Sequence, residues 1–167
     1  MFAFYNRHSN TFYNNLIKLS RNIFFYKELK LQDNFDTRAI LILLHLSIVI
    51  IAVKDSKNQK FPQKIFDNIF LNIEYHLREM GDGDVAVNKK MKIINKIFYD
   101  ILLKIKKNEH NSFKLNEETL KKHFFNNMKV DTTIMAKFNS YLISFYNFCF
   151  ELDYNNMLKE DINFKYV

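Results

Sequence analysis

The sequence predicts an all-α fold, a single-domain bundle of about six helices around a central helix–GxG turn–helix hairpin. Apolar residues recur three or four positions apart over long stretches, which is the spacing of one helical face. The 167 residues include only two glycines and one proline, too few for the many turns of a β fold. We assign residues 1–167 to one helical domain, with 1–10 and 155–167 as less ordered tails.

The first two helices are predicted from apolar residues alone. A first helix carries an apolar face at Phe12, Leu16, Leu19 and Ile23. The next segment, Ala39–Val53, is apolar on every side except for His45. As a membrane span it would measure roughly 22 Å against roughly 30 Å of hydrocarbon, and an ionisable histidine would be costly there. We therefore expect a central helix that others cover on several sides.

The hairpin lies around Leu77–Asp84, the run that holds both glycines. The helix before it has its apolar face at Phe61, Ile65, Phe66, Ile69, Phe70, Ile73 and Leu77. The helix after it begins near Val85, with Met91, Ile94, Phe98, Ile101, Leu102 and Ile105 on one face. Gly81 is expected to end the first helix with a positive φ. Asp84 is expected to cap the second helix.

The last third of the chain is predicted to hold two more helices. Polar connectors at 55–60 and 106–112 flank the hairpin. A short helix from about Asn116 to Asn127 and a final one from about Asp131 to Tyr154 follow. Asn116 and Asp131 both suit an N-cap. Cys149, the only cysteine, lies in an apolar run and is expected to be a small buried hydrophobe in a reducing compartment.

The composition and motifs exclude several classes of chemistry. Two glycines cannot form a phosphate-binding loop or a dinucleotide fingerprint. One cysteine cannot support a cysteine-rich metal site, and Glu74-x-His76 has the wrong spacing for a di-iron bundle. Asp82-Gly-Asp84 lacks the carboxylate of a calcium loop at the twelfth position, which is Ile93. We expect a protein that is not an enzyme and has no catalytic residues, no metal and no cofactor.

Two blocks of the sequence carry a family pattern. The first contains Phe25-Tyr26, Asp33-x-Phe35-Asp36-x-Arg38 and Leu41-x-x-Leu44-His45. The second contains Gln63-x-x-Phe66-Asp67-x-x-Phe70, Leu77-Arg78-Glu79-Met80-Gly81-x-Gly83-Asp84 and Val87-x-Lys89-Lys90-Met91-Lys92. Together they resemble the ubiquinol–cytochrome c chaperone family from about Phe25 to Leu103, and the resemblance fades in the last sixty residues. The first block departs from the family's Pro, Thr and Gly at Gln32, Asn34 and Thr37.

The resemblance implies a function and a set of partners. Family members are assembly chaperones that bind newly made cytochrome b and assist assembly of the ubiquinol–cytochrome c reductase (bc) complex, respiratory complex III. It also implies a peripheral position at the inner membrane, cytoplasmic in a bacterium or on the matrix side in a eukaryote. Further partners to test are the ribosome near its exit tunnel, an anionic membrane surface and a second assembly factor.

The family pattern selects candidate partner-binding residues: Asp33, Arg38, His45, Arg78, Glu79, Gly81, Gly83, Asp84, Lys89, Lys90 and Lys92. We interpret His45 as a structural link between the blocks, with Glu79 or Asp84 as its partner. Arg78 and Glu79 are interpreted as internal ties that set the hairpin angle. An apolar groove near the turn is expected to cover transmembrane segments of the client.

The basic character of the chain leaves two other functions open. A net charge of +7 with a pI near 9.3 suits anionic lipid, RNA or a ribosome surface, but also a merely solvated basic surface. Lys89, Lys92 and Lys96 fall on one helical face, opposite the apolar stripe. The alternatives to a chaperone are a ribosome- or RNA-associated binding protein and a structural helical subunit of a larger complex.

Overall fold

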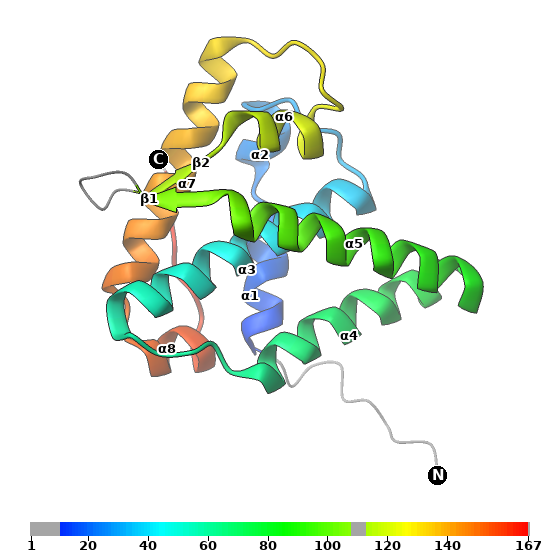
Figure 1. Cartoon of the computed structure of the whole chain (residues 1–167), viewed down its shortest axis with the longest axis horizontal. Coiled ribbons are helices and arrows are strands. Elements are labelled where there is room, and N and C mark those ends of the chain that lie inside the picture. The colour runs from blue at the N-terminus through cyan, green and yellow to red at the C-terminus, as the bar shows by residue number, and fades with distance from the viewer. Residues whose placement is uncertain (1–10, 108–112, 167) are drawn as a thin grey trace.

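The protein is almost entirely helical, and its computed structural model describes residues 11–107 and 113–166 (Figure 1). The long helices are α3 (Phe35–Lys57), α4 (Gln63–Glu79), α5 (Asp84–Lys104) and α7 (Thr132–Glu151). The short ones are α1 (Thr11–Ser20), α2 (Ile23–Lys27), α6 (Glu117–Phe124) and α8 (Tyr154–Lys159). The all-α prediction is confirmed. Within the described residues, α2 and α8 are additional to the six helices predicted.

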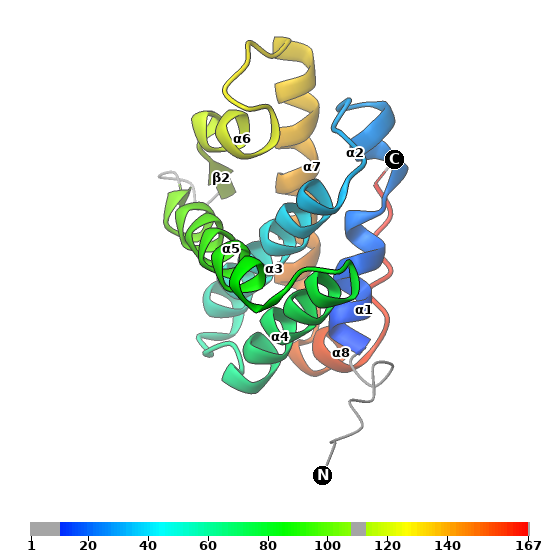
Figure 2. The same ribbon diagram turned by 90° about the vertical axis from the view of Figure 1, so that its right-hand side faces the viewer.

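Helix α3 is the centre of the bundle and contacts α1, α5, α6 and α7. Asn34 caps it by accepting a hydrogen bond from the Thr37 amide at 2.9 Å, and Asn58 ends it in the left-handed conformation. Every residue from Leu41 to Val49 is buried, because neighbouring helices cover α3 on several sides (Figure 2). The expectation of a buried central helix is therefore met.

Helix α3 is longer than the apolar run from which it was predicted. The apolar run is extended by polar residues at both ends, so the 23 residues of α3 measure roughly 34 Å. By length and composition α3 is the one helix of the described chain that could cross a membrane, yet 67% of its most apolar window is buried inside the fold. Burial, rather than length, identifies it as a core helix.

The N-terminal helix ends earlier than its apolar spacing predicts. Phe12, Leu16 and Leu19 are buried on one face of α1 as expected. Asn22 then interrupts the helix and caps α2 by accepting a hydrogen bond from the Phe24 amide at 3.0 Å. Ile23 consequently lies at the start of a new helix and is exposed.

A small antiparallel sheet replaces part of the expected polar connector. Strands β1 (Ile105–Lys107) and β2 (Phe113–Leu115) pair with Ile105 opposite Leu115, and the rest of the connector, 108–112, lies outside the described residues. Phe113 and Leu115 are buried while Lys114 is exposed, which is the alternation of a half-buried strand. Phe113 stacks on Tyr146 of α7 with ring centroids 5.1 Å apart.

The C-terminal segment is packed rather than loose. Asn116 and Asp131 cap α6 and α7 as predicted, accepting from the Glu118 and Thr133 amides. After α8, the chain runs back along the bundle, and Phe164 and Tyr166 lie 5.6 and 5.2 Å from the ring of Tyr141. The lower order expected for 155–167 stays a prediction, and the described residues 155–166 include most of α8 and these two aromatic contacts. Residues 1–10 and 167 lie outside the described part.

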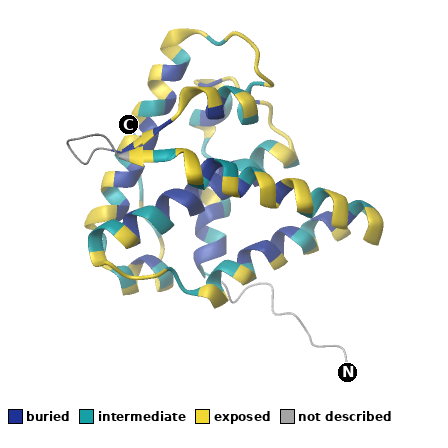
Figure 3. Cartoon of the chain, in the orientation of Figure 1, coloured by how far each residue is buried: buried dark blue, intermediate teal, exposed yellow. Residues whose placement is uncertain are grey.

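Helices α4 and α5 form the predicted hairpin, which projects from the bundle with its turn at the far end (Figure 1). Buried residues line the side of α5 that faces the bundle, and exposed residues follow its outer side (Figure 3). Ile94, Phe98 and Ile101 are buried, as the apolar stripe predicts. The hairpin thus presents its motif residues at the edge of the core.

Candidate functional site

The turn between α4 and α5 has the glycine geometry that the sequence predicts. Gly81 has a φ of +97°, a conformation that residues with a Cβ rarely adopt. The Gly81 amide donates to the Arg78 carbonyl at 3.0 Å, and the Asp82 amide to the Leu77 carbonyl at 3.3 Å. These bonds satisfy carbonyls at the end of α4 and reverse the chain within a few residues.

The start of α5 differs from the prediction. Gly83 is the N-cap, with an ordinary φ of −76° and no side-chain cap. Asp84 is the first helical residue, and its carboxylate bonds to Arg78 instead of capping the helix. The reason is that Arg78, the penultimate residue of α4, brings its guanidinium to this carboxylate across the turn.

Ion pairs connect the two arms of the hairpin. Arg78 binds Glu74 on its own helix, with Nη2 and Oε1 2.9 Å apart, and Asp84 on the next. The hydrogen bonds that the Arg78 guanidinium donates to Asp84 and Glu74 raise its pKa. Lys90 Nζ lies 2.6 Å from Asp82 Oδ2. Arg78 is therefore the tie that the sequence predicts, while Lys90 is engaged within the hairpin.

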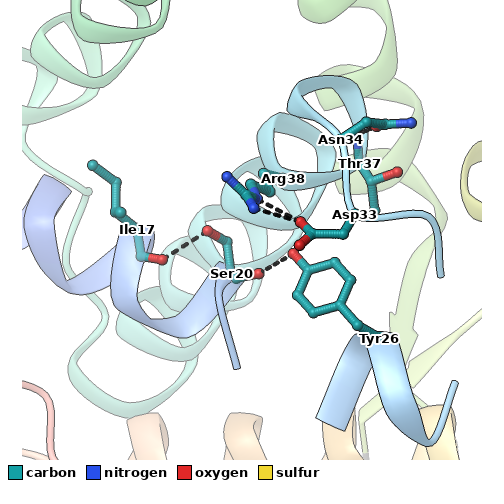
Figure 4. Close-up of polar contacts among 7 residues, drawn as sticks. All are labelled: Ile17, Ser20, Tyr26, Asp33, Asn34, Thr37 and Arg38. Atoms are coloured by element: carbon teal, nitrogen blue, oxygen red, sulfur yellow. Dashed lines mark hydrogen bonds and ion pairs between the residues drawn. The ribbon is translucent and has the colours of Figure 1, made fainter. Parts of the chain in front are cut away.

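The first block forms a second polar cluster, at the start of α3 (Figure 4). Arg38 donates to Asp33 Oδ1 through Nη2 at 2.6 Å and Nε at 2.8 Å. This hydrogen bond with Asp33 raises the pKa of Arg38. Tyr26 Oη donates to the Ser20 carbonyl at 2.5 Å, and Ser20 Oγ to the Ile17 carbonyl at 2.8 Å. The Asp33–Arg38 pair ties the loop before α3 to that helix, and the Tyr26–Ser20 bond ties α2 to α1.

The two blocks meet at a cleft of about 260 Å³ between α1, α3 and α4, here called the α1–α3–α4 cleft. Phe35, Ile42 and Ile73 are among the apolar residues that line it. Arg38 of the first block and Glu79 of the second also line it, 41 positions apart in the sequence. Tertiary packing thus places charged residues of both blocks beside one apolar surface.

Tyr13 and His76 belong to the same cleft and were not identified from the sequence. Tyr13 Oη lies 3.0 Å from His76 Nδ1, joining α1 to α4. His76 was considered only as a metal ligand, and Tyr13 lies before the family pattern begins. The sequence did offer one local indication that Tyr13 is buried. It lies one turn before the buried Leu16 on the predicted first helix.

A larger cleft of about 640 Å³, the α3–α5–α6 cleft, lies on another side of the α3 N-terminus. Ile40, Ile93 and Phe125 contribute apolar surface, and Lys30, Lys90 and Lys122 are its basic residues. Gln32, Asn34 and Thr37, the three departures of the first block from the family pattern, all line this cleft. The departures therefore gather away from the α1–α3–α4 cleft.

His45 does not join the motif residues. Its Nδ1–H donates to the Leu41 carbonyl at 2.7 Å, so the neutral ring accepts at Nε2 from Tyr141 Oη at 2.7 Å. Burial lowers the pKa of His45 to about 4. The predicted partners Glu79 and Asp84 are wrong, because α3 carries His45 into the core toward α7 while the hairpin turn projects from the bundle.

The remaining motif lysines and the cysteine take distinct positions. Lys89 and Lys92 are exposed on α5, whereas Lys90 pairs with Asp82. Cys149 is buried, and burial raises the pKa of its thiol. Within residues 11–107 and 113–166, no group of three or more His, Cys, Asp and Glu side chains could hold a metal ion.

Comparison with protein families decides the affiliation of the chain. The model of the ubiquinol–cytochrome c chaperone family matches residues 27–164. The chain belongs to this family. The match extends well beyond Leu103, so the C-terminal part, in which the resemblance was expected to fade, is also covered by the family model.

A solved structure supports the fold of the family member described here. The crystal structure of the Cbp3 homolog from Brucella abortus superposes with a TM-score of 0.67 at 18% sequence identity, covering 93% of this chain and 87% of that one. At this identity the likeness concerns the fold. No curated protein matches the chain in sequence.

Proposed function

We propose that this protein is a non-enzymatic assembly chaperone that binds newly made cytochrome b and assists assembly of the ubiquinol–cytochrome c reductase complex. Family membership supports the assembly role. We choose the α1–α3–α4 cleft as the client-binding site because both motif blocks meet there. The proposed mechanism is stoichiometric holding, in which the chaperone covers apolar client surface until partner subunits arrive.

The chemistry of the cleft suits a few anchoring side chains rather than a whole helix. Its volume of about 260 Å³ is below the roughly 300–1,000 Å³ of ordinary ligand pockets. Its apolar walls suit hydrophobic side chains of the client, and Arg38 and Glu79 can orient polar groups of the client's backbone or loops. Met80, 56% exposed beside the cleft, provides flexible apolar surface of the kind that adapts to varied partners.

The proposal also covers the localisation of the protein and its further partners. We place the protein peripherally at the inner membrane, on the cytoplasmic side in a bacterium or the matrix side in a eukaryote, because its client is a membrane protein. A second assembly factor or the ribosome can share the task, and co-purification with the tagged chaperone tests both.

The function is tested first in cells that lack the protein, with and without a plasmid copy. Reduced-minus-oxidised spectra of their membranes report the b-type haems of the bc complex. We expect the b-type signal to fall in the deletion strain and to return with the plasmid. An unchanged spectrum in the deletion strain contradicts the proposal.

The site is tested with a matched pair of substitutions, Met80→Asn and Met128→Asn. The two methionines are similarly exposed, at 56% and 62%, but Met80 lines the α1–α3–α4 cleft and Met128 the α3–α5–α6 cleft. We expect Met80→Asn to reduce cytochrome b recovered with the tagged chaperone about tenfold, the effect of one apolar anchor worth about 1.4 kcal/mol. Met128→Asn should retain the client. The reverse pattern would move the client to the larger cleft.

A further inference from the structure

One side of α5 is exposed along its whole length and is defined here as the outer face. It consists of Val85, Lys89, Lys92, Lys96, Tyr99 and Leu103, which follow one another at intervals of four and three residues. This spacing places all six side chains on one side of the helix. Val85 is 71% exposed and Leu103 75%, so the apolar members are presented to solvent together with the lysines.

The core fixes the orientation of this face. Val87, Ile94, Phe98 and Ile101 are buried on the opposite side of α5. Turning the helix to cover the outer face would expose these four residues, at roughly 1.5–3 kcal/mol for each large side chain. An exposed helical face that carries both apolar and basic residues is typical of an interaction surface.

The charge of the outer face is uncompensated among the described residues. Lys89, Lys92 and Lys96 form no ion pair with any residue of 11–107 or 113–166. The two acidic residues of α5 are engaged elsewhere: Asp84 binds Arg78, and Asp100 binds Lys122 at 2.9 Å and His123 at 2.7 Å. The face therefore carries three adjacent positive charges, with Val85 before them and Tyr99 and Leu103 after them.

We propose that the outer face of α5 docks the protein on an anionic lipid surface. The lysines contact acidic headgroups, and Val85, Tyr99 and Leu103 enter the headgroup region, the arrangement of an interfacial amphipathic helix. RNA is the other polyanion with complementary charge. The face favours lipid over RNA because its apolar members are mainly aliphatic, whereas single-stranded RNA is bound by stacking on several aromatic or arginine side chains. The 21 residues of α5 lie along the surface over roughly 31 Å.

This inference names the contact surface for the peripheral localisation proposed above, but it does not depend on the client. Vesicle binding is measured with the purified full chain alone. Failure to capture cytochrome b would leave the vesicle result unaffected, and failure to bind vesicles would leave the chaperone test unaffected.

The experiment is sedimentation with sucrose-loaded vesicles of phosphatidylcholine alone or mixed with phosphatidylglycerol. We expect binding to the mixed vesicles that weakens with salt, and little binding to phosphatidylcholine alone. Each lysine at an anionic surface contributes about fivefold to partitioning, so the triple variant Lys89→Glu, Lys92→Glu and Lys96→Glu should lose at least about 100-fold. Because these three side chains are exposed, the substitutions should leave the far-UV circular dichroism spectrum unchanged.

Two controls separate a docking face from general basicity. Lys60→Glu, Lys64→Glu and Lys165→Glu together change the net charge equally at exposed lysines outside α5 and should bind almost as wild type. Val85→Ser with Leu103→Ser keeps the charge and should weaken binding severalfold. Equal losses in the two lysine triples, or equal binding to neutral and mixed vesicles, would overturn the proposal. The proposal would also be overturned if the protein bound RNA through the outer face and did not bind vesicles.

Discussion

The two glycines of the hairpin turn permit a paired test, because the same Gly→Ser substitution can be made at two positions with different backbone conformations. Gly81 has a φ of +97°, whereas Gly83 has a φ of −76° and a ψ of 170°. A Cβ at either position would meet no heavy atom within 4 Å. Steric contact is therefore absent at both, and a difference between Gly81→Ser and Gly83→Ser comes from backbone conformation and from the serine hydroxyl at the N-cap.

The expected magnitudes follow from this geometry. A residue with a Cβ in the left-handed region costs roughly 1–2 kcal/mol, and a φ of +97° lies beyond the ordinary minimum near about +57°. We expect Gly81→Ser to lower the free energy of unfolding by about 2 kcal/mol. Gly83→Ser places a hydroxyl at the N-cap and should be neutral or stabilising by a few tenths of a kcal/mol. Gly81→Val should cost more than Gly81→Ser, because β-branched residues resist a positive φ.

Urea and thermal unfolding followed by circular dichroism measure both variants. For a domain of this size about 2 kcal/mol corresponds to a fall in Tm of roughly 4–8 °C. Gly83→Ser should stay at or above the wild-type Tm. Equal midpoints for the two serine variants, or a Gly81→Val protein as stable as wild type, would refute the assigned turn geometry.

Four further predictions concern the core and the hairpin. The pKa of His45 is about 4 in the fold against 6.5 when unfolded, so its contribution is complete above about pH 6.5 and is lost as the pH falls toward 4. The slope of unfolding free energy over that interval should be shallower in His45→Gln, and an identical slope would contradict this. Tyr141→Phe leaves the buried His45 Nε2 without its donor and should cost about 1–3 kcal/mol in urea unfolding, unlike a surface substitution. Arg78→Ala removes exposed ion pairs only, so its urea midpoint should stay close to wild type; a large fall would show that the pairs hold the hairpin. Cys149 should react with a thiol reagent only after unfolding, and rapid reaction of the native protein would disprove its burial.

Sequence alone was sufficient for the features that depend on near neighbours. A helical face is a pattern of three- and four-residue intervals, so the long helices and the buried stripe Ile94, Phe98 and Ile101 could be predicted. The positive φ of Gly81 and the caps at Asn116 and Asp131 are likewise properties of a few adjacent residues. Arg78 was interpreted as a tie within the hairpin, and its partners Glu74 and Asp84 lie within six positions of it.

Tertiary structure decided the features that depend on distant residues. His45 and Tyr141 are 96 positions apart, and nothing in the helical spacing selects that partner over a nearby carboxylate. The C-terminal segment is held by contacts of Phe164 and Tyr166 with a ring of α7, which no local pattern shows. The α1–α3–α4 cleft exists only once three helices pack together. Local periodicity determines which side of each helix is buried, but the free energy of packing decides which helices meet and so where the two motif blocks form one site.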